Sequence, residues 1–175
     1  MSPEPPRVVF DCVIFAQALI NPKGPAGECV KAAEGGECLL HVSPFVLQEI
    51  RELPNKLPVR HGITPERVET LIRQVREYAV VVTDVPERFK HPIDAKDSAY
   101  INLALATQSE LVVSRDRHLL MLMDTATAEG RSFAQQFPEL HIIRPVEFLN
   151  ELDRRRSDSG NQSTHDSDDD SESGS

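Results

Sequence analysis

Five short apolar runs recur along the chain, and they restrict the folds open to it more than any other feature. They are rich in Val, Leu and Ile and do not alternate apolar with polar residues; the runs are RVVF (7–10), CLLHV (38–42), AVVVT (79–83), ELVVS (110–114) and LHII (140–143). Runs of this kind suit strands that are buried on both faces of a parallel sheet. Segments with helical features separate them. We therefore expect an α/β fold with a central, mostly parallel sheet of about five strands and helices on both faces.

The segments between the runs contain helix start signals. Ser43-Pro44 and Thr64-Pro65 each combine a capping side chain with a proline that fits the first turn, and Asp94 supplies a third cap. After Thr64, apolar residues recur at the spacing that places them on one face of a helix. We expect helices at 12–20, 26–34, 43–53, 64–78, 94–107 and 145–152, a helical turn at 119–123 and a loop at 84–92.

Most of the chain is expected to form one domain, because 175 residues suit one domain better than two. We expect an N-terminal extension at residues 1–6, the domain at 7–153 and a disordered acidic tail, rich in Ser and Asp, at 154–175. From residue 157 onward the chain has six acidic residues and no Lys or Arg. It also lacks apolar residues there whose burial would offset the entropy cost of ordering.

Charge and cysteine content narrow the classes of partner. The formal net charge is −9, but residues 1–156 hold 22 acidic and 19 basic residues, so the body is close to neutral. The strongly basic field of many nucleic-acid binders is absent, and a polyanion would have to be held by local bases and by metal. The three cysteines have no CxxC spacing, which argues against a zinc site or a disulfide framework. Without a signal-peptide pattern or a membrane-spanning stretch, we expect a cytoplasmic protein that does not enter membranes.

Carboxylates follow the predicted strands at the ends where sites form in parallel sheets. Asp11 ends the first run and Asp116 lies two residues past the fourth. Asp97 lies at the start of the helix before that run, and Glu49 lies in the helix after the second run. Acids held together repel, and their pKa values rise unless a cation lies among them. Because Mg²⁺ and Mn²⁺ prefer oxygen ligands, the pattern favours a divalent-metal site that hydrolyses phosphodiesters.

Each acid also has a purely structural interpretation. Asp97 is favoured by the helix dipole in a first turn, Asp94 is better explained as a cap than as a ligand, and Asp116 suits a turn before a helix. Glu49 is consistent with a solvated helix position. Asp11 is the hardest to explain in this way, because it lies between apolar runs, where a charge needs a partner.

Taken in order, these segments resemble the PIN-domain ribonucleases, and especially toxins of the VapC-like type. The matching segments are VVFDCVIFAQAL, SPFVLQEIREL, DAKDSAYINLALATQSELVVSRDRHLL and the closing HIIRPVEFL. The resemblance covers residues 7–150 and implies a three-layer PIN fold for the predicted domain. It also implies an endoribonuclease that depends on Mg²⁺ or Mn²⁺, with RNA as substrate and with a homodimer and an antitoxin protein as partners.

The resemblance also implies roles for individual residues. The catalytic and metal-binding positions are Asp11, Glu49, Asp97 and Asp116, and Asp94 is a further candidate metal ligand. Ser114 is expected to hydrogen-bond within the acid cluster and to contact substrate. The candidate contacts to RNA phosphate are Arg115, Arg117 and Lys96. For each of these bases taken alone, a solvated surface charge is the simpler explanation.

One departure from the family pattern sets up an alternative function. The family usually has Asn two residues after the first acid, where this chain has Val13. Since that Asn helps to organise the acid site, the alternative is a catalytically weakened PIN-like module that binds RNA or a protein. Retention of all four acids favours the nuclease. Val13 also excludes a phosphatase with an Asp nucleophile, which needs a second Asp there, and no nucleotide-binding glycine motif occurs.

Overall fold

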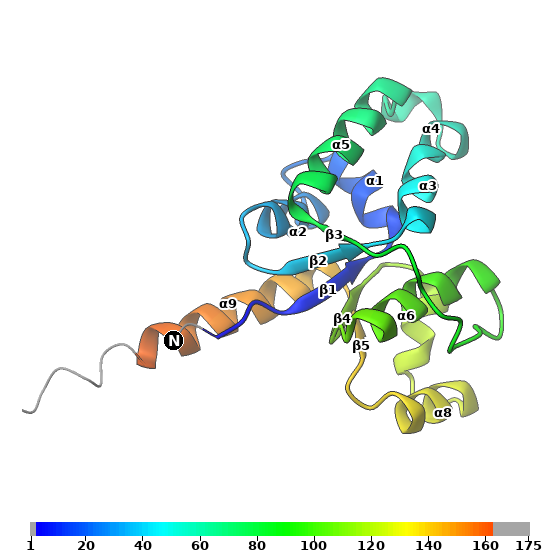
Figure 1. The fold of residues 1–175 in the computed structure, drawn as a ribbon, viewed down its shortest axis with the longest axis vertical. Helices are drawn as coiled ribbons and strands as arrows, with labels where there is room; N and C mark the ends of the chain where they lie inside the picture. Colours follow the sequence, from blue (N-terminus) through cyan, green and yellow to red (C-terminus); the bar gives the residue numbers. More distant parts are fainter. Residues whose placement is uncertain (1–2, 163–175) are drawn as a thin grey trace, which may run out of the picture.

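The computed structural model of the chain describes residues 3–162 and has a five-stranded sheet at its centre (Figure 1). All four strand pairs are parallel, and the strand order is β3-β2-β1-β4-β5. The strands are β1 (Arg7–Phe10), β2 (Leu39–Val42), β3 (Val80–Val81), β4 (Leu111–Val113) and β5 (His141–Ile143). This confirms the predicted fold class. Residues 1–2 of the predicted extension and residues 163–175 of the predicted tail lie outside the described residues.

Helices cover both faces of this sheet. The helices are α1 (Cys12–Ile20), α2 (Pro25–Glu34), α3 (Pro44–Arg51), α4 (Leu53–Lys56), α5 (Pro65–Tyr78), α6 (Ala95–Thr107), α7 (Arg117–Leu120), α8 (Ala128–Gln136) and α9 (Pro145–Gln162), with 3₁₀ turns η1 (Val59–His61) and η2 (Met121–Met123). Helix α2 packs against α1, α5 and α9. Helix α6 packs across β1, β2 and β4. Among the described residues, no helix combines the length and the apolar character needed to cross a membrane.

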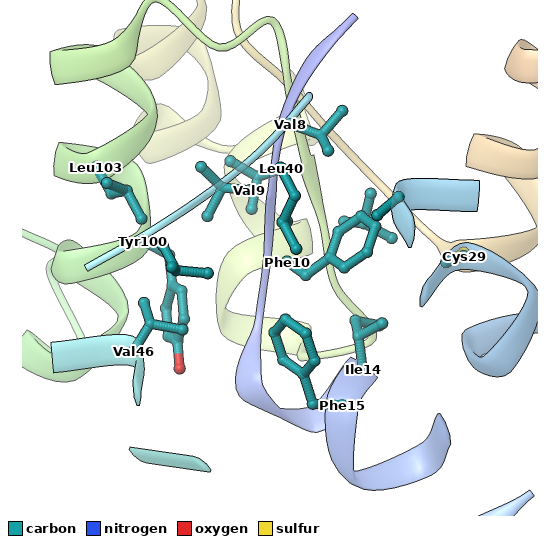
Figure 2. Packing of buried hydrophobic residues seen from close by; sticks show 14 of the residues in the cluster. Val8, Val9, Phe10, Ile14, Phe15, Cys29, Leu40, Val46, Tyr100 and Leu103 are labelled. Atoms are coloured by element: carbon teal, nitrogen blue, oxygen red, sulfur yellow. The ribbon is translucent and has the colours of Figure 1, made fainter. Parts of the chain in front are cut away.

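The side chains of β1 show why its sequence is apolar without alternation. Phe10 points to the same side as Val8 and packs against Phe15 of α1 and Phe148 of α9, with ring centroids 5.9 and 5.7 Å apart (Figure 2). Val9 points to the other side, toward α6 (Figure 2). All five side chains are fully buried. A strand between two helical layers must be apolar at every position, as the sequence predicted.

The predicted helix starts are confirmed by their hydrogen bonds. Ser43 Oγ accepts from the backbone N of Val46 at 3.3 Å, and Thr64 Oγ1 accepts in the same way at the start of α5. Asp94 accepts from the backbone N of Lys96 at 2.9 Å and caps α6. The cap at Ser43, directly after β2, fixes the direction in which the chain leaves the carboxyl edge of the sheet.

Strand β3 and helix α8 are among the elements that differ from the sequence prediction. Strand β3 is shorter than the run at 79–83 because it lies at the sheet edge, where it pairs only with β2 and leaves Val80 42% exposed. Helix α8 was not predicted. It is anchored by Phe133, whose ring packs edge-on against Phe89 at 5.4 Å and lies 5.3 Å from Phe137. The contact with Phe89 comes from a distant loop, so local periodicity gives little sign of it.

The predicted disorder from residue 154 is wrong for residues 154–162, which continue α9. Arg155 donates to Glu151 on its own helix at 2.9 Å and to Glu110, just before β4, at 3.0 Å. Among the described residues, Arg154 instead bonds along the helix, to Glu151 and Asp158. The segment lacks apolar residues whose burial could stabilise a helix, and the ion pairs along and beyond the helix stabilise it instead.

We expect Arg155→Gln to lower the free energy of unfolding by about 1 kcal/mol, because it removes the ion pair between α9 and the segment before β4. Arg154→Gln is the matched control and should cost less, since its pairs stay within one helix. Urea unfolding followed by circular dichroism at low salt measures both. Equal losses in the two variants would show that the pair with Glu110 adds nothing.

Candidate active site

Two neighbouring strands place the first acid of the site. Asp11 follows β1, and its backbone N donates to Val113 O of β4 at 3.0 Å. Its side chain accepts from Ser114 Oγ at 2.7 Å and from the backbone N of Val13 at 3.2 Å. Asp11 is 3% exposed and Ser114 is fully buried. The acid is therefore held in one orientation beneath the surface, and Ser114 hydrogen-bonds within the cluster as expected.

Ser114 also positions the second acid. Its Oγ accepts from the backbone N of Asp116 at 2.9 Å while donating to Asp11, so one hydroxyl links the two carboxylate-bearing segments. Asp116 Oδ1 in turn accepts from the backbone N of His118 at 2.7 Å and caps α7. The side chain of Asp116 remains 36% exposed and faces solvent more than Asp11 does.

The first turn of α6 adds a third acid. The side chain of Asp97 is only 8% exposed, and its Oδ2 has no hydrogen-bond partner among the described residues. His118 Nδ1 lies 3.7 Å from Asp97 Oδ2 and 3.9 Å from Asp116 Oδ1. Asp94, Asp97 and His118 each offer a ligand atom, and these atoms lie within 4.8 Å of one another. The predicted acids after β1, in α6 and after β4 thus lie together.

The electrostatics of the cluster favour a bound cation. Burial, together with the negative charges of Asp116, Asp94 and Asp11, raises the pKa of Asp97 to about 7, and the charge of His118 opposes them. Burial also raises the pKa of Asp11, against the hydrogen bond from Ser114. Carboxylates that are buried together without a counter-charge are costly, because each destabilises the ionised form of the others.

Glu49 lies beside this cluster and has a partner of its own. Its Oε2 accepts from Lys56 Nζ at 2.9 Å, and its side chain is 14% exposed. The charge of Glu49 contributes to the raised pKa of Cys12, the residue that follows Asp11, so Glu49 borders the acid site. Lys56 also pairs with Glu52 at 3.0 Å. The structure thus places the fourth predicted acid near Cys12 and pairs it with a lysine.

The candidate phosphate contacts lie next to Asp116 and Asp97 in the sequence. Arg115 and Arg117 are exposed and flank Asp116 in the chain. Lys96 lies in the first turn of α6, next to Asp97 in the sequence. The charge of Arg115 also acts on Cys29 of α2. Burial raises the pKa of that thiol, and the charge of Arg115 opposes the increase.

The cysteines take no part in this arrangement as reactive groups. Cys12, Cys29 and Cys38 are free, and burial raises the pKa of each thiol to about 12. Thiols with such a pKa are protonated at neutral pH and are poor nucleophiles.

His91 and His118 were not singled out in the sequence. His91 is 4% exposed, and its Nδ1 accepts from the backbone N of Ile93 and of Asp94 at 3.1 Å. With Nδ1 accepting, Nε2 donates to His118 O at 2.7 Å. One imidazole therefore joins the loop before α6 to α7. The position of His118, two residues after Asp116, is a weak sequence indication of a role in the site. The sequence of the loop around His91 gives no such indication.

We expect His91→Leu to lower the free energy of unfolding by about 2 kcal/mol, because two N–H groups and one carbonyl lose their partner. His41→Leu is a matched control: His41 is also buried, but its Nδ1 has no hydrogen-bond partner among residues 3–162. The second variant should cost clearly less in urea unfolding. A larger loss for His41→Leu would contradict the role given to His91.

Two hollows in the surface lie at opposite edges of the sheet, one beside the acids and one far from them. One hollow, of about 780 Å³, is lined by Pro3–Pro6 and Arg154–Arg156 at the amino edge of the sheet, opposite the acids. A hollow of about 400 Å³ lies at the carboxyl edge along α6, lined by Phe45, Thr83 and Asn102 among others. Phe45 is 38% exposed there. Of these two hollows, the second adjoins the elements that hold the acids.

Comparison with known proteins gives matches over most of the chain. The sequence matches a family model described as "PIN domain" over residues 7–118. An uncharacterized protein of Methanocaldococcus jannaschii is 25% identical over 150 residues, which cover 85% of this chain and 92% of that protein. Among solved structures, the PIN domain endonuclease Utp24 is 16% identical, with 82% of this chain and 88% of that chain covered and a TM-score of 0.44.

Proposed function

The chain belongs to the PIN domain family, and from this premise we propose that it is a metal-dependent endoribonuclease that hydrolyses RNA phosphodiester bonds. The observation that carries the proposal is the convergence of Asp11, Asp97 and Asp116 at one edge of the sheet, with the buried Asp97 Oδ2 left without a hydrogen-bond partner. A structural acid in a first turn would not need this burial among other acids.

The residues present fit a divalent cation. The donors are mostly carboxylate oxygens, which Mg²⁺ and Mn²⁺ prefer, and the unpartnered Asp97 Oδ2 is the kind of atom that a cation would satisfy. We assign Asp11, Asp97 and Asp116 as the principal ligands, with Asp94 and Glu49 at the margin. When bound, such an ion would orient the phosphodiester, activate the attacking water and stabilise the leaving oxygen.

The chain itself supplies orientation. Ser114 fixes both Asp11 and the segment that bears Asp116, so two ligands cannot turn independently. Val13 lacks the side-chain amide that the family usually has at this position, but its backbone N still donates to Asp11. We propose that these two hydrogen bonds keep Asp11 in a productive orientation without the amide.

The substrate side of the proposal rests on groups around the acids. The proposed phosphate contacts are Arg115, Arg117 and Lys96. They are local bases in a domain whose net charge is close to zero. The exposed ring of Phe45, in the hollow along α6, offers a surface on which an unpaired base can stack. This combination favours single-stranded RNA or loops over a regular duplex.

We propose a narrower biological role from the order of the sequence segments. The run of motifs resembles VapC-like toxins, so the chain is proposed to act in the cytoplasm as the toxin of a toxin–antitoxin pair, with an antitoxin that covers the acid edge and with a homodimer as the active form. Induced expression tests this role: the wild-type chain should arrest growth and an Asp11→Asn variant should not. Growth with both would remove the toxin role and leave the nuclease to be tested separately.

Cleavage by purified protein is the direct test of the nuclease. A mixed set of single-stranded RNA and transfer RNA should be cut with Mn²⁺ or Mg²⁺ and left intact with EDTA. If the folded protein cuts nothing with either ion, the binding-module alternative is favoured. Val13→Asn then becomes informative, because a gain of cleavage in that variant would show that the missing amide had weakened the site.

A further inference from the structure

We propose that His118 provides a nitrogen ligand in the acid cluster, so that the site takes a divalent transition-metal ion in preference to Mg²⁺. This inference rests on the proposed function and goes beyond it, because the acids alone do not distinguish these ions. It concerns the three ligand atoms of Asp94, Asp97 and His118 that lie within 4.8 Å of one another.

The position of the imidazole is the first support. His118 Nδ1 lies 3.7 Å from Asp97 Oδ2 and 3.9 Å from Asp116 Oδ1. These distances are too long for hydrogen bonds, so the ring faces both acids without being satisfied by either. The side chain of His118 is 39% exposed, which leaves room for an ion to approach it from solvent.

The state of Asp97 is the second and independent support. Its side chain is more than nine-tenths buried, and Oδ2, the atom that faces His118 Nδ1, has no hydrogen-bond partner among the described residues. A buried oxygen without a partner is costly, and a cation shared with the imidazole nitrogen would satisfy both atoms.

Nitrogen is the donor that separates the candidate ions. Mg²⁺ takes oxygen ligands almost exclusively, whereas first-row transition metals accept imidazole as well as carboxylate. A site with Asp11, Asp97 and Asp116 alone would treat Mg²⁺ and Mn²⁺ as similar hard ions. Adding His118 Nδ1 lowers the free energy of the Mn²⁺ complex more than that of the Mg²⁺ complex.

The backbone of His118 allows a clean substitution. Its N donates to Asp116 Oδ1 and its O accepts from His91 Nε2, so the two hydrogen bonds that hold this residue do not involve its own ring. His118→Asn keeps them and places an amide oxygen close to the former position of Nδ1. The variant therefore exchanges a nitrogen donor for an oxygen donor, with little expected change in the fold.

The test is Mn²⁺ binding to the full chain, measured by electron paramagnetic resonance. Pulsed spectra of the wild type should show coupling from ¹⁴N, which His118→Asn should lose and the exposed control His141→Asn should keep. Competition with Mg²⁺ should show that the preference for Mn²⁺ falls about tenfold in His118→Asn. Circular dichroism melting confirms that the variants are folded.

The outcomes separate this inference from the proposed function. Mn²⁺ bound without nitrogen coupling in the wild type, or with coupling that survives in His118→Asn, would overturn the role of His118 and leave the metal site in place. If no Mn²⁺ binds to the folded wild type, the inference and the metal dependence of the proposed nuclease both fail. Coupling lost only in His118→Asn, together with the reduced preference for Mn²⁺, establishes the ligand.

Discussion

Asp97→Asn should reduce metal-dependent cleavage of RNA by about 10³-fold, and Asp11→Asn should do the same. The amide keeps the shape of the carboxylate but removes the negative charge that would hold a divalent ion. For Asp97 the change also takes away the unpartnered Oδ2 at the centre of the cluster. For Asp11 it also turns one of the two accepting oxygens into a donor, so the hydrogen bond from either Ser114 or Val13 must change along with the charge.

A matched control separates this effect from a general loss of charge. Asp124 is exposed, precedes α8, and accepts from the backbone N of Ala126, a bond that an amide oxygen can also accept. Asp124→Asn should keep full activity. Rates at saturating metal and at several metal concentrations show whether binding or turnover is lost. If Asp97→Asn retains more than about a tenth of the wild-type rate, Asp97 is not a principal ligand.

Much of this site is predictable because it depends on strand ends. Asp11 and Ser114 follow runs that could only be buried parallel strands, and neighbouring parallel strands deliver their carboxyl ends to one edge. The helix caps at Ser43, Thr64 and Asp94 are equally local, since each depends on a few consecutive residues. The predictions that held depend on a few consecutive residues, or on the rule that neighbouring parallel strands end at the same edge of the sheet.

The remainder depends on contacts between segments far apart in the chain. The contact of His91 with His118 joins a loop without a sequence pattern to the turn after β4. The pairing of Glu49 with Lys56 depends on how α4 folds back after α3. The helical extension beyond Asp153 likewise depends on Glu110, more than forty positions earlier in the sequence. Side-chain partners of this kind follow from the packed fold, and periodicity or composition does not reveal them.

Between about pH 4 and pH 7, the metal-free protein should lose stability relative to its own Asp97→Asn variant. Burial and neighbouring acids raise the pKa of Asp97 from 3.8 to about 7 in the folded state. The folded state therefore holds a proton that the unfolded chain releases, and the free energy of unfolding falls as pH rises through this interval. Below the unfolded pKa the penalty is absent; above pH 7 it is complete, at roughly 4 kcal/mol if Asp97 titrates alone.

Other groups act in or near the same interval, and the difference between wild type and variant removes most of their effect. The pKa of His41 is lowered by burial, so His41 stabilises the folded protein as pH rises toward 6.5, with the opposite sign. Glu151 has a pKa lowered by Arg154 and acts at lower pH. Asp11, whose pKa is raised mainly by burial, adds a penalty of the same sign as Asp97. His41 and Glu151 do not touch Asp97, so their effects should cancel in the comparison.

Urea unfolding at pH 5 and pH 8, in EDTA and then with saturating Mg²⁺ or Mn²⁺, measures this prediction. In EDTA the variant should be the more stable protein at pH 8 by a few kcal/mol and nearly equal to wild type at pH 5. Metal should reverse the order at pH 8, because only the wild type gains full binding energy. If the stability difference between wild type and variant in EDTA is the same at pH 5 and pH 8, burial and the neighbouring acids do not destabilise the ionised carboxylate of Asp97. A reversal of the stability order on addition of metal means instead that the negative charge of Asp97 destabilises the metal-free protein and is also the source of its affinity for the ion. Activity then requires that this carboxylate be kept.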